Sequence, residues 1–161
     1  MIDVSRSAVD HCVQNISSEL ESSNSRHLIL HLGVNVSAKS FFIENFAYNN
    51  MTFRIPDNEG NQPKEECIDI NISLDASLPA RFPIHEMMAF LKETNLHAHL
   101  STDPGRFICN YIFYRSLRNC NLDVNRTDVV FVHTPPEEIC PMETQIAFID
   151  KFVDLWRSHF S

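Results

Sequence analysis

Short apolar runs of strand length alternate along this chain with longer segments whose apolar residues recur at helical spacing. Residues 5–22 and 143–160 have the helical pattern, and so does the segment that begins at Pro83. The segments 27–34 and 128–133 are mostly apolar and are typical of buried strands. Helices that alternate with such strands predict an α/β fold with a largely parallel sheet.

The size and charge of the chain limit the kinds of partner that we expect. The 161 residues suffice for one domain with a substantial core, and we expect a single domain over residues 1–161. The net charge of −8, with acidic residues scattered along the chain, argues against nucleic acid or an anionic membrane as a partner. The longest apolar runs are too short to span a bilayer, and no basic-plus-apolar signal region opens the chain.

The cysteines indicate a reducing environment. The chain contains five of them, an odd number, and no two form a CxxC pair. A disulfide framework would need an even number at regular spacings, so we expect a cytoplasmic location.

Other segments predict further elements. Residues 40–55 are rich in aromatic and β-branched side chains and are expected to be extended, whereas residues 56–63 contain turn-forming residues. The alternation from Ile68 to Leu74 predicts a half-exposed strand or an extended arm, and Leu96–Ser101 is predicted to be a strand. The closing helix is expected to turn one apolar face inward, formed by Ile146, Ile149, Phe152, Val153 and Trp156.

A candidate nucleophile follows the last of these strands. The segment from Ser101 to Tyr114 predicts a tight turn that leads into an amphipathic helix, with Cys109 at the helix start. Unpaired backbone N–H groups and the positive end of the helix dipole both favour an ionised thiolate there. The alternative is that Cys109 is a small apolar residue buried on the helix face, as most free cysteines are.

Two further residues could complete a catalytic group. A cysteine nucleophile needs a base, and the imidazole of that base is best oriented by a third group. His133 ends a predicted strand, and Glu44 stands among apolar neighbours that favour partial burial of its carboxylate. The alternatives are that His133 caps its strand and that Glu44 is a surface residue on an edge strand.

Metal catalysis competes for the histidines. His97 and His99 alternate on one face of a predicted strand, a spacing that zinc can use. No cysteine or carboxylate stands at a matching spacing around them, which favours histidines without a metal. We therefore expect neither a metal nor an organic cofactor.

Three motifs, in the same order, resemble those of the pyroglutamyl-peptidase I (pyrrolidone-carboxylate peptidase) family. The cysteine motif is Gly105-Arg-Phe-Ile-Cys-Asn-Tyr-Ile-Phe-Tyr114, and the histidine motif is Phe131-Val-His-Thr-Pro-Pro136. The glutamate motif is Ile43-Glu-Asn-Phe-Ala-Tyr-Asn49, followed by Arg54-Ile-Pro-Asp-Asn58. The resemblance extends from about His31 to the closing helix.

The resemblance implies a fold and an activity. The fold would be a three-layer α/β/α sandwich of the phosphorylase/hydrolase-like type. The activity would be that of a cysteine peptidase that removes N-terminal pyroglutamate from peptides through an acyl-enzyme. Cys109 would be the nucleophile, His133 the general base and acid, and Glu44 the orienting group.

The resemblance also implies substrate-binding positions. Arg54 matches a position where many family members have a cation near the site; the alternative is a surface ion pair with Asp57 or Glu59. Ile55, Phe107 and Ile108 match positions that line an apolar slot for the lactam ring, with core packing as the alternative. The backbone N–H of Cys109 would stabilise the oxyanion.

The chain departs from the family pattern in two places. The first strand, a Gly-Phe-x-x-Phe loop and a helix of the family have no counterpart here, so we expect an N-terminally truncated domain. Pro104 stands where the family usually has alanine and fixes the backbone before Cys109. Two competing hypotheses follow: a catalytically impaired homologue that acts as an interaction protein through an exposed sheet edge, or a cysteine hydrolase with a different acyl substrate. The sequence leaves the oligomeric state open.

Overall fold

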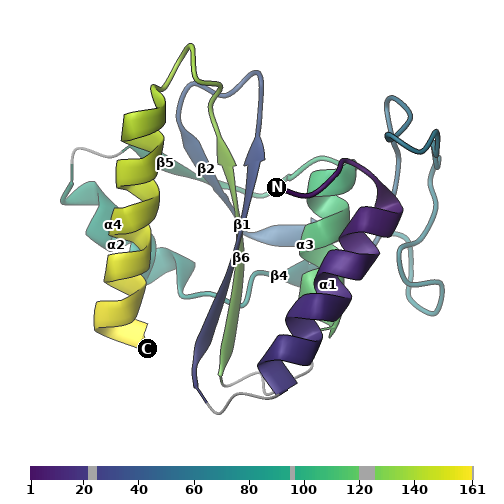
Figure 1. The fold of residues 1–161 in the computed structure, drawn as a ribbon, viewed down its shortest axis with the longest axis horizontal. Helices are drawn as coiled ribbons and strands as arrows, with labels where there is room; N and C mark the ends of the chain where they lie inside the picture. The colour runs from purple at the N-terminus through teal and green to yellow at the C-terminus, as the bar shows by residue number, and fades with distance from the viewer. Residues whose placement is uncertain (22–24, 95–96, 120–125, 161) are drawn as a thin grey trace.

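The computed structural model describes residues 1–21, 25–94, 97–119 and 126–160. Figure 1 shows the described helices and strands. The helices are α1 (Arg6–Glu21), α2 (Ile84–Lys92), α3 (Ile108–Asn119) and α4 (Met142–Phe160). The strands are β1 (His27–Val34), β2 (Phe41–Glu44), β3 (Phe46–Tyr48), β4 (Ser77–Pro79), β5 (Ala98–Ser101) and β6 (Thr127–Thr134).

The main sheet has the strand order β1-β6-β2-β5. Strands β1 and β6 are parallel with Gly33 opposite His133, and β2 and β5 are parallel with Glu44 opposite Ser101. The two parallel pairs meet at an antiparallel ladder between β2 and β6. The prediction of a largely parallel sheet is confirmed, and β3 and β4 add a short antiparallel pair beside it.

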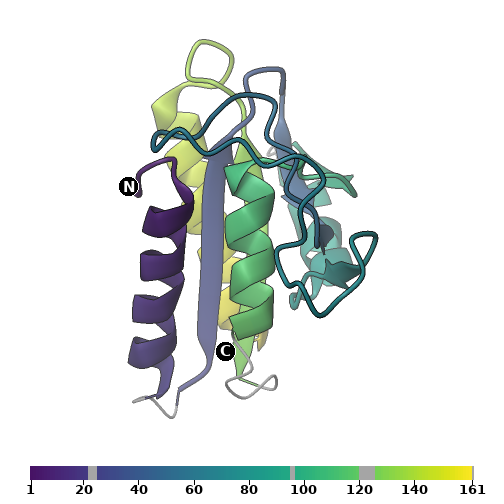
Figure 2. The same ribbon diagram turned by 90° about the vertical axis from the view of Figure 1, so that its right-hand side faces the viewer.

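Helices cover both faces of the main sheet, as the three-layer prediction requires. Figures 1 and 2 show α1 and α3 together on one face and α2 and α4 on the other. All eight residues of β6 are buried, because this central strand packs on both helical layers. Val129 and Phe131 face the core beneath α1 and α3, whereas Val130 and Val132 face the core beneath α2 and α4.

The segment Ile68–Leu74 forms neither a strand nor an extended arm, so this prediction was wrong. It consists of bends and turns, and Ile70 is 86% exposed. The buried side chain of Asn49 explains the difference. Its Nδ2 donates to the carbonyls of Asp69, Ile72 and Ser73, and its Oδ1 accepts from the Asp69 N–H. These bonds occupy backbone groups that a strand ladder would need.

The buried face of α4 also differs from the prediction. Ile146 is 51% exposed, whereas Phe148, which the sequence pattern left out, is 1% exposed. The Phe148 ring stacks on Phe41 of β2 with 3.8 Å between ring centroids. This contact turns the helix so that Phe148, Phe152 and Trp156 face the sheet.

Several other predictions agree with the structure. Helix α2 follows Pro83, and the strands at 27–34 and 128–133 are present as β1 and β6. Leu96, at the start of a predicted strand, and Cys120 lie outside the described residues. Within the described ranges, no helix is long and apolar enough to cross a membrane.

Candidate active site

Cys109 is the second residue of α3 and lies in the first turn of that helix. The turn before it contains Gly105 in the left-handed region, at φ +80°, and the Gly105 N–H donates to Asp103 Oδ1 at 3.0 Å. The N–H of Tyr111 donates to the Phe107 carbonyl at 3.0 Å. The Cys109 N–H precedes this bond, so it has no acceptor inside the helix and can bind a developing negative charge.

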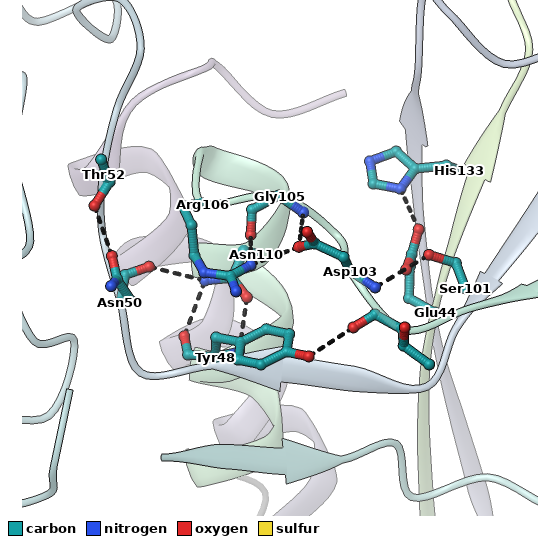
Figure 3. Close-up of polar contacts among 11 residues, drawn as sticks. Glu44, Tyr48, Asn50, Thr52, Ser101, Asp103, Gly105, Arg106, Asn110 and His133 are labelled. Carbon is teal, nitrogen blue, oxygen red and sulfur yellow. Dashed lines mark hydrogen bonds and ion pairs between the residues drawn. The ribbon is translucent and has the colours of Figure 1, made fainter. Parts of the chain in front are cut away.

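His133 and Glu44 meet across the antiparallel ladder. Phe42 pairs with His133 and Glu44 with Phe131, so Glu44 and His133 are diagonal neighbours on one face of the sheet. His133 Nδ1–H donates to Glu44 Oε1 at 2.7 Å, and Figure 3 shows the two side chains pointing toward each other. His133 is 6% exposed and Glu44 is 1% exposed, so water scarcely reaches this pair.

Glu44 and Cys109 both influence the protonation of His133. Burial lowers the pKa of His133, but hydrogen bonds to Cys109 and to Glu44, together with attraction to both side chains, raise the pKa of His133 to about 9. The imidazole is therefore protonated near neutral pH and can act as a proton donor. The His133–Glu44 pair is hydrogen-bonded, and the Cys109 sulfur lies beside Gly33, the residue that pairs with His133 between β1 and β6.

The second oxygen of Glu44 has no such partner. Glu44 Oε2 is buried and makes no hydrogen bond within the described ranges. A buried carboxylate oxygen without a donor is costly, so the bond through Oε1 is the main compensation for burying this group. Removing His133 would leave the carboxylate without that compensation.

Gly33 of β1 lies against the sulfur of Cys109. A Cβ atom at this position would be 3.2 Å from Cys109 Sγ and 2.7 Å from Phe131 Cζ. The second distance is shorter than real contacts allow, so a Cβ here would displace the buried Phe131 ring, and glycine leaves room for both this ring and the Cys109 sulfur.

Arg54 and Ile55 lie on the surface of the loop after β3. The Arg54 side chain is exposed and makes no ion pair with any described residue, and Ile55 is 51% exposed. Asp57, one suggested partner of Arg54, instead accepts hydrogen bonds from the Arg6 and Asn61 N–H groups at 3.1 and 2.8 Å. These bonds, which outweigh the effect of burial, hold the pKa of Asp57 below its usual range.

Phe107 and Ile108 differ in their surroundings. Phe107 is half-buried and packs edge-on against Phe53, with 4.8 Å between ring centroids. Ile108 is 6% exposed and belongs to the core beneath α1 and α3, which favours the packing role that the sequence left open. His97 and His99 are both exposed, and the described residues contain no group of three side chains able to hold a metal.

One polar residue of this region, Asn110, was not predicted from the sequence. Asn110 follows Cys109 and is fully buried, and its side chain bonds the backbone of Tyr48 and Asn50. The available signal was a polar residue between the apolar Ile108 and Tyr111 of an amphipathic helix. Its partners lie about 60 residues earlier, and no local pattern identifies them.

Comparison with known sequences identifies the family. The profile of the pyroglutamyl peptidase family matches residues 6–146, most of the chain. The chain belongs to this family. The pyrrolidone-carboxylate peptidase of Bacillus subtilis is 38% identical over 94 residues, which is 57% of this chain and 42% of that protein. The pyrrolidone-carboxylate peptidase of Fusobacterium nucleatum is 31% identical over 129 residues, which is 79% of this chain and 59% of that protein.

Solved structures of the family have the same fold. Pyrrolidone carboxyl peptidase from Thermus thermophilus superposes with a TM-score of 0.78 at 27% identity, over 92% of this chain and 77% of that chain. A mutant pyrrolidone carboxyl peptidase from P. furiosus gives a TM-score of 0.83 at 21% identity, over 99% of this chain and 81% of that chain. The chain spans about half the length of several curated relatives, for example 51% of the Thermococcus litoralis protein.

Proposed function

We propose that this pyroglutamyl peptidase family member is a cysteine peptidase that removes N-terminal pyroglutamate from peptides. The observation that carries the proposal is the hydrogen-bonded pair of His133 and Glu44, with the Cys109 sulfur at the start of α3 next to the residue that pairs with His133. Family membership supports the pyroglutamyl substrate, and the placement of Cys109 near the His133–Glu44 pair supports the thiol mechanism. The reaction needs no metal or organic cofactor.

The first half-reaction forms an acyl-enzyme. The Cys109 sulfur attacks the carbonyl carbon of the pyroglutamyl residue, a C–S bond forms, and the carbonyl electrons move to oxygen. The N–H groups at the start of α3, including that of Cys109, stabilise this oxyanion. When the carbonyl re-forms, the C–N bond breaks and the leaving amine takes its proton from His133.

The second half-reaction releases the product. His133, now neutral, accepts a proton from water as the water oxygen attacks the thioester carbon. The C–S bond then breaks with its electron pair on sulfur, pyroglutamate leaves, and His133 keeps the proton it took from water. Glu44 holds the ring through Nδ1 and balances the charge of the imidazolium in both halves.

The substrate contacts belong to the same proposal. Ile55 and Phe107 present apolar surface that suits the uncharged lactam ring, and Arg54 supplies a cation on the same loop as Ile55. Ile108 acts from the core by supporting the first turn of α3. A reducing compartment such as the cytoplasm suits a thiol nucleophile, and the four described cysteines are free thiols.

Hydrolysis of pyroglutamyl-aminomethylcoumarin tests the activity. We expect Cys109→Ala to lower turnover by more than about a thousandfold, because the nucleophile is lost. The matched control is Cys12→Ala, which removes a half-buried thiol from α1 and should leave turnover unchanged. Turnover that survives in Cys109→Ala contradicts the mechanism.

Alkylation by iodoacetamide separates the competing hypotheses. Fast, selective labelling of Cys109 without turnover of the coumarin substrate favours a hydrolase with another acyl substrate. Equal labelling of Cys109 and the other cysteines favours a non-enzymatic interaction protein.

A further inference from the structure

The side chain of Asn110 joins the helix that contains Cys109 to the end of β3. The Tyr48 N–H donates to Asn110 Oδ1 at 2.8 Å, and Asn110 Nδ2 donates to the carbonyls of Tyr48 at 2.9 Å and Asn50 at 3.1 Å. Asn110 has no exposed surface. Figure 3 shows this group between the first turn of α3 and the chain that leaves β3.

The same two segments are bonded along their length. The Tyr48 hydroxyl donates to the Thr102 carbonyl at 2.7 Å, and the Thr52 N–H donates to the Arg106 carbonyl at 3.1 Å. The Arg106 guanidinium lies over the Tyr48 ring, 3.8 Å from its centroid. Residues 48–52 therefore follow the turn 102–110 closely, and Asn110 is the contact nearest to Cys109.

Residues 48–52 are in turn fixed relative to Glu44. Glu44 pairs with Ser101 in the β2–β5 ladder, and the Asn45 N–H donates to the Ser101 carbonyl at 2.8 Å. The Asn45 carbonyl accepts from the Ala80 N–H at 2.8 Å. Asn110 thus connects the segment that contains the nucleophile to the segment that contains the orienting carboxylate.

Helical geometry explains why this connection matters for Cys109. Consecutive side chains on an α-helix point about 100° apart, so anchoring Asn110 sets the direction in which Cys109 points. A side-chain sulfur lies roughly 5 Å from the helix axis, so a rotation of about 10° moves it by about 0.9 Å. A displacement of about 1 Å at a reacting atom can cost about a hundredfold in rate.

We propose that Asn110 is a positioning residue that fixes the rotation of the first turn of α3 and so sets the direction in which the Cys109 sulfur points toward the His133–Glu44 pair. This inference rests on the proposed function, because it assigns Asn110 a role in that same site. Asn110 does not touch the reacting atoms; it acts through the direction of its neighbour.

The chain offers a matched control for a purely structural role. Asn49 is also fully buried, and its side chain makes four hydrogen bonds to the backbone of residues 69–73. Asn49→Ala therefore removes a similar number of buried bonds. Those bonds join residue 49 to residues 69–73, so the bonds of Asn110 to Tyr48 and Asn50 are kept.

The experiment compares Asn110→Ala with Asn49→Ala by three measurements. Urea unfolding gives the stability lost, iodoacetamide gives the alkylation rate of Cys109 near neutral pH, and NMR titration gives the pKa of His133. We expect both variants to lose stability. Only Asn110→Ala should slow Cys109 alkylation, by at least about tenfold, and lower the pKa of His133 toward 6.5. If Asn110→Ala does not fold, Asn110→Asp replaces it, because a carboxyl keeps the acceptor for the Tyr48 N–H and loses the amide that donates to the carbonyls of Tyr48 and Asn50.

Two results would overturn the inference. One is an equal effect of the two variants on Cys109 alkylation and on the pKa of His133. The other is a pKa near 6.5 for His133 in the wild-type chain. His133 would then have no interaction with Cys109 for Asn110 to maintain. A wild-type chain that fails to turn over the coumarin substrate contradicts the proposed function instead, and the alkylation and titration data still decide the role of Asn110.

Discussion

The contacts of His133 predict how the stability of the protein depends on pH. His133 binds its proton more tightly in the folded chain than in the unfolded chain, because its pKa rises from 6.5 to about 9 on folding. The proton therefore stabilises the folded chain fully below pH 6.5, and this contribution is lost as the pH rises through about 9. Each unit of pKa corresponds to about 1.4 kcal/mol, so the loss between about pH 6.5 and pH 9.5 is about 3 kcal/mol.

His133→Asn removes the titrating group while retaining an N–H that can reach Glu44. Urea unfolding can be followed by the fluorescence of Trp156, the single tryptophan, which is 7% exposed. We expect the unfolding free energy of the wild-type chain to fall by about 3 kcal/mol more than that of His133→Asn over this pH range.

His31 provides the control for this experiment. His31 is also buried, but burial lowers its pKa to about 4, and its Nε2 is bonded to Ser116 Oγ at 2.8 Å. A histidine that stays neutral in the folded chain lowers the stability of the protein only as the pH falls below 6.5. His31→Asn should therefore keep the wild-type pH dependence above that value. If His133→Asn shows the same pH dependence as the wild type, the pKa of His133 is not raised on folding.

Two further substitutions test contacts in the fold. Gly33→Ala places a Cβ atom 2.7 Å from Phe131 Cζ and 3.2 Å from Cys109 Sγ. We therefore expect the free energy of unfolding in urea to fall by about 1–3 kcal/mol and the alkylation of Cys109 to become slower. Unchanged stability and unchanged reactivity would contradict these close contacts. Trp156→Phe removes the 2.8 Å hydrogen bond from Trp156 Nε1 to the buried Asp128 carboxylate. We expect the free energy of unfolding, followed by circular dichroism, to fall by about 1–3 kcal/mol. A stability equal to that of the wild type would show that this bond contributes nothing.

The fold was largely predictable because its signals are local. The run Val129–Val132 predicted a buried strand, and β6 is buried along its whole length as the central strand. The prediction for Ile68–Leu74 was wrong because alternation alone does not reveal that the buried Asn49 side chain binds this backbone. The burial of Phe148 in place of Ile146 depends on stacking against β2, a contact outside the helix.

The residues proposed for the site could be selected from the sequence, but the contacts that hold them in place could not. Motif order was sufficient to select Cys109, His133 and Glu44, although 89 residues separate the last two. The role of Asn110 could not be predicted, because its partners come from a distant segment whose path only the folded chain defines.

The mass of the acyl-enzyme tests most directly whether Cys109 is the nucleophile. The chain would be mixed with a pyroglutamyl substrate, quenched in acid within one turnover, digested and mapped by mass spectrometry. We expect one pyroglutamyl group, bound as a thioester to Cys109. Turnover without an adduct on Cys109, or with the adduct on another cysteine, would contradict this expectation.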